Sequence, residues 1–310
     1  NNRLQLTGNT YYRNIKTNSF NGDINEDTIE HWAQNGPYQS DVCRYQDSEL
    51  CNGLINTGLT QQQNWGTQGQ AILSDKLFGL DNQMLFGLGY DQSVMAFNQS
   101  SQFANMLPDR GMAGVAALND ESSVALSGDS ITWSFFTQDT LNITQNLHLT
   151  ASGRYNFTSV SNKDALIASG PESLSGKSNF DRFNPSVGLT YNPLKEIGYY
   201  ANYSEATRAP TSIETGCANP LVPCRLPNAM AGDPPLKQVI SENWETGFRG
   251  ELPGHVNWNL GYFRIENAND LQFVVSPSQS SMGYFKNFGK TRRQGIEFGL
   301  DRKIEKWNYG

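Results

Sequence analysis

The stretch LHLTASGRYNFT, residues 147–158, alternates residue by residue between an apolar and a polar set. The apolar set begins with Leu147 and Leu149 and ends with Phe157, and the polar set runs from His148 to Thr158. Successive side chains of a β-strand point to opposite faces of its sheet. The stretch therefore predicts a strand with one apolar face and one wholly polar face.

The same alternation recurs along the chain, at 84–91, 256–262 and 296–301, and more weakly at 187–191 and 244–248. Short turns are expected near 80–83, 144–146, 192–196, 252–255 and 303–306. Between them lie long polar segments, near 17–61, 98–128, 159–182 and 209–238. The pattern predicts an all-β unit over 1–310, with about ten complete strands and the beginning of an eleventh.

The composition excludes several classes of protein. Only 17% of the 310 residues are charged, against roughly 25% in ordinary soluble domains. The chain holds 29 Gly, 16 Phe and 13 Tyr, whereas disordered chains are poor in aromatic residues. No apolar run approaches the roughly 20 residues of a membrane-spanning helix. The net charge of −7 argues against a nucleic-acid partner, which requires a basic surface.

Short turns that alternate with long loops are typical of outer-membrane β-barrels. A β-sandwich has shorter strands with loops at both ends, and a propeller repeats four strands in each blade. In a barrel, the apolar face meets lipid and the polar face lines the lumen. We therefore predict a transmembrane antiparallel β-barrel whose long loops face outward, with a soluble β protein as the alternative.

The four cysteines form two close pairs, Cys43 with Cys51 and Cys217 with Cys224. Both pairs fall in long polar segments on the outward side of the expected barrel. Small closed loops in such segments indicate local disulfides, which require an oxidising compartment. A zinc site would need tighter spacing or nearby histidines, so no metal site is expected.

Four segments of the second half of the chain carry a family resemblance: NPSVGLTYNP (184–193), YANYSEATRAPT (200–211), ENWETGFRG (242–250) and NFGKTRRQGIEF (287–298). In this order they resemble the later barrel strands of TonB-dependent outer-membrane receptors. The match is specific over 183–303 and rests on the alternation alone over 1–182.

The resemblance implies a barrel of about 22 strands, of which residues 1–310 would be the middle-to-late part. It also implies a plug domain and a TonB box before Asn1, which would engage the TonB complex. The implied location is the bacterial cell outer membrane, where lipid and lipopolysaccharide would surround the barrel. Charged residues that alternate onto the lumen face, such as Glu245 and Asp301, would pack against the plug.

An energised importer of a scarce nutrient is the function that the resemblance implies. A ferric siderophore is the expected ligand, with cobalamin, another metallophore or a saccharide as alternatives. Cationic and aromatic side chains suit an anionic, catecholate-like chelate. The candidate ligand-binding residues of these types are Arg154, Tyr155, Tyr203, Arg208, Arg225 and Tyr284. No cofactor is expected, and iron would enter only within the bound chelate.

Two readings compete with these expectations. Arg208 could instead form a strand-end salt bridge with Glu205 or Glu214, and the whole protein could be a passive porin with no plug. The chain contains neither Gly-x-Ser-x-Gly nor His-Glu-x-x-His, and its Ser, His and Asp residues are not grouped. We therefore expect no catalytic residues and no enzyme.

Overall fold

The computed structural model describes residues 3–35, 43, 50–170, 173–216, 224–225, 236–275 and 282–302. These residues form eleven strands and two short helices. In chain order they are β1 Leu4–Ile24, α1 Glu26–Asn35, β2 Gly53–Leu77, β3 Leu80–Met106, β4 Met112–Asn142, β5 Leu147–Asp164, β6 Gly176–Tyr191, β7 Gly198–Arg208, α2 Ser212–Gly216, β8 Cys224–Arg225, β9 Val239–Leu252, β10 Val256–Val275 and β11 Met282–Arg302. No helix in the described ranges is long and apolar enough to cross a membrane.

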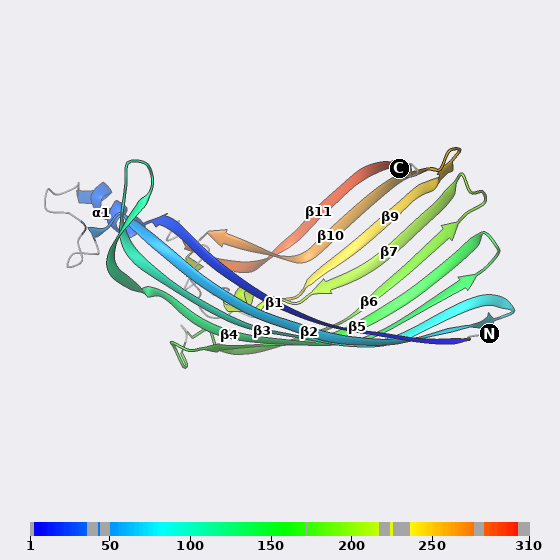
Figure 1. The fold of residues 1–310 in the computed structure, drawn as a ribbon, viewed down its shortest axis with the longest axis horizontal. Helices are drawn as coiled ribbons and strands as arrows, with labels where there is room; N and C mark the ends of the chain where they lie inside the picture. The colour runs from blue at the N-terminus through cyan, green and yellow to red at the C-terminus, as the bar shows by residue number, and fades with distance from the viewer. Residues whose placement is uncertain are drawn as a thin grey trace, which may run out of the picture.

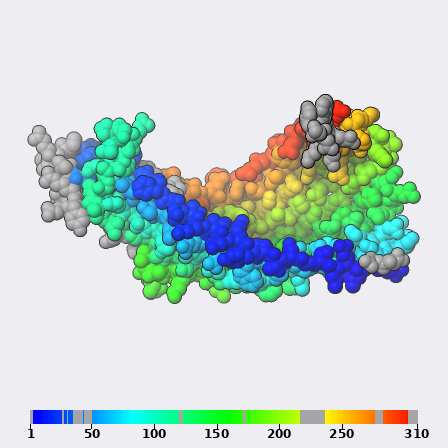
Figure 2. Space-filling view, viewed as in Figure 1, coloured from blue at the N-terminus to red at the C-terminus, as the bar shows by residue number. Residues whose placement is uncertain are grey.

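All eleven strands belong to one antiparallel sheet, in the order β1-β2-β3-β4-β5-β6-β7-β9-β10-β11-β8. The predicted all-β antiparallel fold is confirmed. The short turns gather at one end of the curved sheet, the turn end, and α1 and the longer connections at the other, the loop end (Figure 1). Within the described residues the sheet is open, with β1 on one border and β11, paired at its loop end with the two-residue β8, on the other (Figure 2).

The strand register gives the sheet an apolar face and a polar face. Leu141 lies opposite Leu149 on the apolar face, and Thr140 lies opposite Thr150 on the polar face. The hydroxyls of the two threonines are hydrogen-bonded at 3.1 Å. Large side chains on the apolar face are exposed, and Ile296 on β11 is 75% exposed. An extended exposed apolar surface of this kind marks a face that meets lipid or another protein.

An aromatic row crosses the apolar face. Trp65, Tyr90 and Trp133 stack on three consecutive strands, with ring centroids 4.9 and 4.7 Å apart. Tyr203 and Trp244 continue the row on β7 and β9, with centroids 4.4 Å apart. Tyr and Trp concentrate at membrane–water boundaries because their rings are apolar at one end and polar at the other. The row therefore marks the loop-end boundary of the apolar band.

The turns at the turn end are short. Phe78 and Gly79 join β2 to β3, both with positive φ (54° and 84°), which is typical of a two-residue hairpin turn. The turn expected near 80–83 was therefore placed too late in the chain, because the strand alternation hid its start. The turns expected near 144–146, 192–196 and 252–255 are confirmed. The turn expected near 303–306 lies outside the described residues.

The strands extend further toward the loop end than expected. The segment 98–128 was predicted as a loop, but β3 continues to Met106 and β4 begins at Met112. The segments 17–61 and 159–182 are likewise shortened to the connections 25–52 and 165–175, whereas β9 begins at Val239, as the loop near 209–238 predicts. Beyond the apolar band both faces of a strand meet water, so a polar strand has the composition of a loop.

A disulfide joins Cys43 to Cys51, as predicted, with a Cα–Cα distance of 4.4 Å. Cys51 is fully buried, and its carbonyl accepts a hydrogen bond from Nδ2 of Asn25 at 2.7 Å. Asn25 directly precedes α1, so the bond ties the start of β2 to the start of this helix. The second predicted pair, Cys217 with Cys224, lies outside the described side chains.

A small hydrophobic cluster lies on the polar face near the loop end. Its members on the wall are Met95 and Phe97 of β3 and Val124 and Leu126 of β4. Leu174, from the connection between β5 and β6, completes it, and Ile213 of α2 packs against it. The wall is apolar on this inner side because α2 and the connection fold over it.

Candidate functional site

A polar cluster lies midway along the polar face, with Arg154 of β5 at its centre. The Arg154 Nε donates to Oδ1 of Asn156 at 2.9 Å, and its Nη2 donates to Oγ of Ser134 at 2.7 Å. Ser134 is fully buried and donates to the same Asn156 oxygen at 2.9 Å. Three side chains on two strands thus share a closed set of hydrogen bonds. Their positions follow from alternation, because Ser134 and Asn156 lie opposite each other.

Phe136 supports the Arg154 guanidinium from the wall side. The guanidinium carbon lies 5.3 Å from the centroid of the Phe136 ring, within the range of a cation–π contact. The ring in turn covers Gly87, where a Cβ would overlap it. A glycine is therefore required opposite Phe136, and the ring fills the space that a larger residue would occupy.

Strands β6 and β7 separate beside this cluster. They pair over only six positions, and the pairing ends at Ser186 and Ser204. The next residue of β6 is Pro185, which has no backbone N–H to contribute to a strand ladder. Beyond it, Nη2 of Arg182 donates to Oε2 of Glu205 at 2.7 Å. An ion pair between side chains thus connects the two strands where backbone pairing stops.

A pocket of ≈ 350 Å³ lies between Arg154 and Glu205. Asn184 lines it and is 7% exposed, and its Oδ1 has no hydrogen-bond partner among the described residues. Nε of the adjacent Arg182 also has none there. Buried polar atoms normally have partners, so these two atoms are available to a polar ligand or water. The hydrogen bonds of Arg154 go to the neutral side chains of Asn156 and Ser134, so its charge favours an anionic ligand in this pocket.

Arg208 belongs to a separate unit at the loop end. Its Nη1 and Nη2 donate to the two carboxylate oxygens of Glu214 at 2.7 and 3.0 Å, and this pairing raises the pKa of the Arg208 guanidinium. Glu214 also accepts from the N–H of Thr211, whose Oγ1 accepts from the N–H of Glu214. This is a capping box at the start of α2. We call Arg208, Thr211 and Glu214 the α2 latch.

The latch holds α2 against the polar face of β4 and β5. Nδ2 of Asn162 donates to the Ser212 carbonyl at 2.8 Å and to Oγ1 of Thr215 at 3.1 Å. Opposite this contact stands Gly128, where a Cβ would overlap the Ser212 side chain. Of the two partners expected for Arg208, the structure selects Glu214, so the guanidinium has a structural role at the rim.

Tyr155 and Tyr203 lie on the apolar face, away from Arg154. Tyr155 is opposite Phe183, and Tyr203 is opposite Val187. Tyr155 donates its hydroxyl to Asp181 at 2.7 Å, and Tyr203 donates to Glu205 at 2.8 Å. Arg154 and Tyr155 are neighbours in one strand, so their side chains cannot point into the same space. The two tyrosine rings belong with the aromatic row.

The other two predicted ligand residues lie elsewhere. Tyr284 is half-buried on β11 opposite Val274, near the loop end. Arg225 lies in β8, opposite Met282, and its side chain is outside the described set. The structure therefore places none of the other five predicted residues beside Arg154, although Tyr203 contacts Glu205 of the cluster from the apolar face.

Arg182, Asn184 and Glu205 were not predicted from the sequence as members of the cluster. The alternation of β6 does place Arg182 and Asn184 on one face, and the register sets them opposite Asn156 and Arg154. The register was not visible in the sequence, because a connection of uncertain length joins β5 to β6. Glu205 gave no signal, since its contact depends on the separation of β6 from β7.

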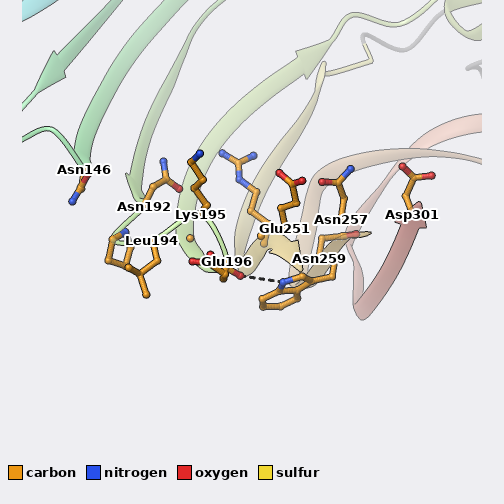
Figure 3. A pocket seen from close by; sticks show the side chains of 14 residues that line it. Asn146, Asn192, Leu194, Lys195, Glu196, Glu251, Asn257, Asn259 and Asp301 are labelled. Carbon is orange, nitrogen blue, oxygen red and sulfur yellow. Dashed lines mark hydrogen bonds between the residues drawn. The ribbon is translucent and has the colours of Figure 1, made fainter. Parts of the chain in front are cut away.

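A second polar pocket, of ≈ 860 Å³, lies at the turn end (Figure 3). Glu251, Asn257 and Asp301 point to the same side of the wall. On the other side, Nε1 of Trp258 donates to the carbonyl of Glu196 at 3.2 Å. Polar and apolar side chains thus remain on opposite faces down to the turns. The pocket is lined by both signs of charge and suits contact with another polar protein surface.

Comparison with protein families finds one match over the entire chain. The family model described as TonB dependent receptor-like, beta-barrel, matches residues 1–310. No curated protein sequence matches the chain.

Several solved structures share the fold. The ferric yersiniabactin uptake receptor FyuA from Yersinia pestis has a TM-score of 0.57 and 16% identity, over 80% of this chain and 33% of that one. The ferric-catecholate import receptor Fiu from K12 E. coli, in its closed form, has a TM-score of 0.61 and 13% identity, over 98% of this chain and 43% of that one. P. aeruginosa FpvA bound to heterologous pyoverdines has a TM-score of 0.62 and 14% identity, over 98% of this chain and 36% of that one. The chain thus spans less than half the length of these receptors.

Proposed function

Because this chain belongs to the TonB-dependent receptor-like β-barrel family, we propose that the protein is an import receptor. Members of the family are bacterial outer-membrane proteins, so the apolar face meets lipid and the polar face meets the barrel interior. The family and fold are those of transport receptors rather than enzymes. Import activity is part of the proposal, since the chain spans only 33–43% of the three receptors compared.

A ferric siderophore is the ligand class that we propose. The observation that supports it is Arg154 on the interior face, whose guanidinium donates to the neutral Ser134 and Asn156 and lines the same pocket as Asn184. Guanidiniums bind carboxylate and catecholate oxygens through paired, charge-assisted hydrogen bonds. Asn184 adds a buried carbonyl oxygen that can accept a hydrogen bond from a ligand N–H or O–H. FyuA, a ferric yersiniabactin uptake receptor, and Fiu, a ferric-catecholate import receptor, share the fold.

The contact residues proposed from the sequence change accordingly. Arg154 stays at the centre of the proposed site, while Arg225 and Tyr284 stay candidates for the loop end. Arg208 is proposed to act through α2, and Tyr155 and Tyr203 are proposed to anchor the barrel in lipid. Iron is cargo in this proposal, carried within the chelate, and no resident cofactor is part of it.

Energy from the TonB complex distinguishes this proposal from a passive porin. The test is uptake of radiolabelled ferric chelates by cells that carry the full-length protein, with and without a functional TonB. The proposal expects uptake to fall to background without TonB. Uptake that persists would support the porin, which the family match does not favour.

Variants of the polar cluster test the proposed ligand site. Arg154→Gln and Arg182→Gln should each weaken chelate binding by roughly tenfold, because each removes a charged hydrogen-bond donor. Arg3→Gln is the matched control, since Arg3 pairs with Asp75 on the exposed turn end at 3.6 Å. Binding to purified receptor is measured by quenching of intrinsic fluorescence. Equal affinities for all three variants would remove the cluster from the ligand site.

A further inference from the structure

The apolar face of β10 and β11 changes abruptly from apolar to charged along the strands. From the turn end, Leu260 and Tyr262 on β10 lie opposite Phe298 and Ile296 on β11. The next residues on the same face of β10 are Arg264 and Glu266, which lie opposite Gln294 and Arg292. No intermediate zone separates the two kinds of surface.

Two guanidiniums converge here on one oxygen atom. Nη2 of Arg264 lies 2.5 Å from Oε1 of Glu266, and Nε of Arg292 lies 2.7 Å from the same oxygen. The carboxylate side chain is 19% exposed, against 39% and 56% for the two arginines. Glu266 therefore holds two like charges close together, with the guanidiniums more open to the surroundings than the carboxylate.

The charges remain unbalanced at this place. Glu242 of β9 lies opposite Glu266, so two carboxylates share this face with Arg264 and Arg292 and with Lys290, which lies two residues from Arg292 on β11 and is exposed. The excess of positive charge therefore favours an anion on the outer surface.

The aromatic row fixes the height of this cluster in the membrane. Arg264 lies opposite Trp244 on β9, and Trp244 stacks on Tyr203 within the row. Aromatic rows lie at the level of lipid headgroups. The two guanidiniums thus stand where phosphate groups of outer-leaflet lipids are found, on the lipid side of the wall.

We propose that Arg264 and Arg292 form a binding site for the phosphate group of an outer-leaflet lipid headgroup. Each planar guanidinium can present two N–H groups to phosphate oxygens, a geometry that lysine lacks. Glu266 acts by keeping the two guanidiniums within reach of one phosphate. The site is distinct from the proposed ligand site, because it lies on the opposite face of the sheet from Arg154.

Native mass spectrometry of the purified full-length receptor tests the site. The probes are bisphosphorylated lipid A and the same lipid with both phosphates removed. Wild type should retain the phosphorylated lipid, and the variant Arg264→Gln/Arg292→Gln should bind it roughly tenfold more weakly. The single variant Arg292→Gln changes the more exposed position and should give an intermediate loss of lipid binding. It serves as the test if the double variant fails to fold.

Arg293→Gln is the matched control. Arg293 adjoins Arg292 in sequence but lies opposite Ile265, on the polar face. The variant Arg293→Gln makes the same change of charge as Arg292→Gln, and the proposal expects it to leave lipid retention unchanged. The proposal is overturned if the Arg264 and Arg292 variants retain the phosphorylated lipid as wild type does, or if dephosphorylated lipid binds equally well. The lipid is also overturned as the source of the phosphate if inorganic phosphate displaces bound lipid A as well as free phosphorylated lipid A does at the same concentration.

Discussion

Replacing Glu214 by glutamine tests whether the α2 latch holds α2 on the barrel wall. Glutamine keeps the shape of the side chain and one oxygen acceptor, but it loses the charge that attracts Arg208. The backbone N–H of Thr215 donates to the Thr211 carbonyl at 2.9 Å and is exposed to exchange when α2 opens. Exchange at this amide therefore reports on the closed state of the latch.

The magnitude follows from the exposure of the pair. A two-bond arginine–carboxylate pair is a strong ion pair, but the Arg208 side chain is 49% exposed and the Glu214 side chain is 14% exposed. Screening by water reduces its contribution to about 1 kcal/mol. A weakened capping contact adds about 0.5 kcal/mol. Together these raise the opening equilibrium of α2 by roughly tenfold.

Hydrogen–deuterium exchange of the peptide spanning 208–216 is the measurement. The Glu214→Gln variant should exchange the Thr215 amide roughly ten times faster, while the strands keep wild-type protection because α2 can open locally. Glu251→Gln is the control, since Glu251 pairs with His255 at the turn end at 2.8 Å. If Thr215 exchanges at the wild-type rate in the Glu214 variant, the latch does not hold α2.

Three further predictions concern the wall itself. Gly87→Ala should lower the free energy of unfolding by about 1–3 kcal/mol, because the new methyl displaces the Phe136 ring. Gly69→Ala, which has open space around it, should change the free energy of unfolding by less than about 1 kcal/mol. Denaturant unfolding in detergent checks both variants. Cys51→Ser should destabilise the α1 region by about 2–3 kcal/mol, from a sequence separation of 8, seen as faster proteolysis there but not at the turn end. Trp65→Ala should lower the free energy of unfolding in lipid by about 1 kcal/mol or more, because a stacked ring at the boundary is lost; an equal stability in lipid would contradict the role of the row.

The two faces of the sheet could be predicted because the strand period is two. The alternation at 147–158 alone places Arg154 on the polar face and Tyr155 on the apolar face, and the structure agrees. The Cys43–Cys51 bond was also predictable, because the two cysteines are separated by only eight positions in a polar segment. These features depend only on residues close together in sequence.

Features that depend on the ends of strand pairing could not be predicted. The hydrogen bond between Arg182 and Glu205 exists because β6 and β7 stop pairing at Ser186, and no local pattern announces that position except Pro185. The extent of the strands in 98–128 was hidden for a different reason, because water on both faces removes the apolar signal. The capping box from Thr211 to Glu214 was visible as a motif, but its bond to Arg208 requires the chain to turn back at the rim.

The lengths of β3 and β4 set where a ligand first encounters the protein. β4 carries 31 residues, whereas a crossing of the membrane takes about 9–11. Register shifts against β3 take up some of this length, so the height is set by β3, which runs about 16 residues from Tyr90, opposite Trp133 in the aromatic row, to Met106. At ~3.3 Å per residue and a tilt of ~40° these residues rise on the order of 40 Å above the lipid. The loop end lies outside the cell in barrels of this kind. A molecule that diffuses toward the cell therefore first contacts the part of the barrel wall that projects above the bilayer. From there it reaches the level of Arg154 along one continuous wall.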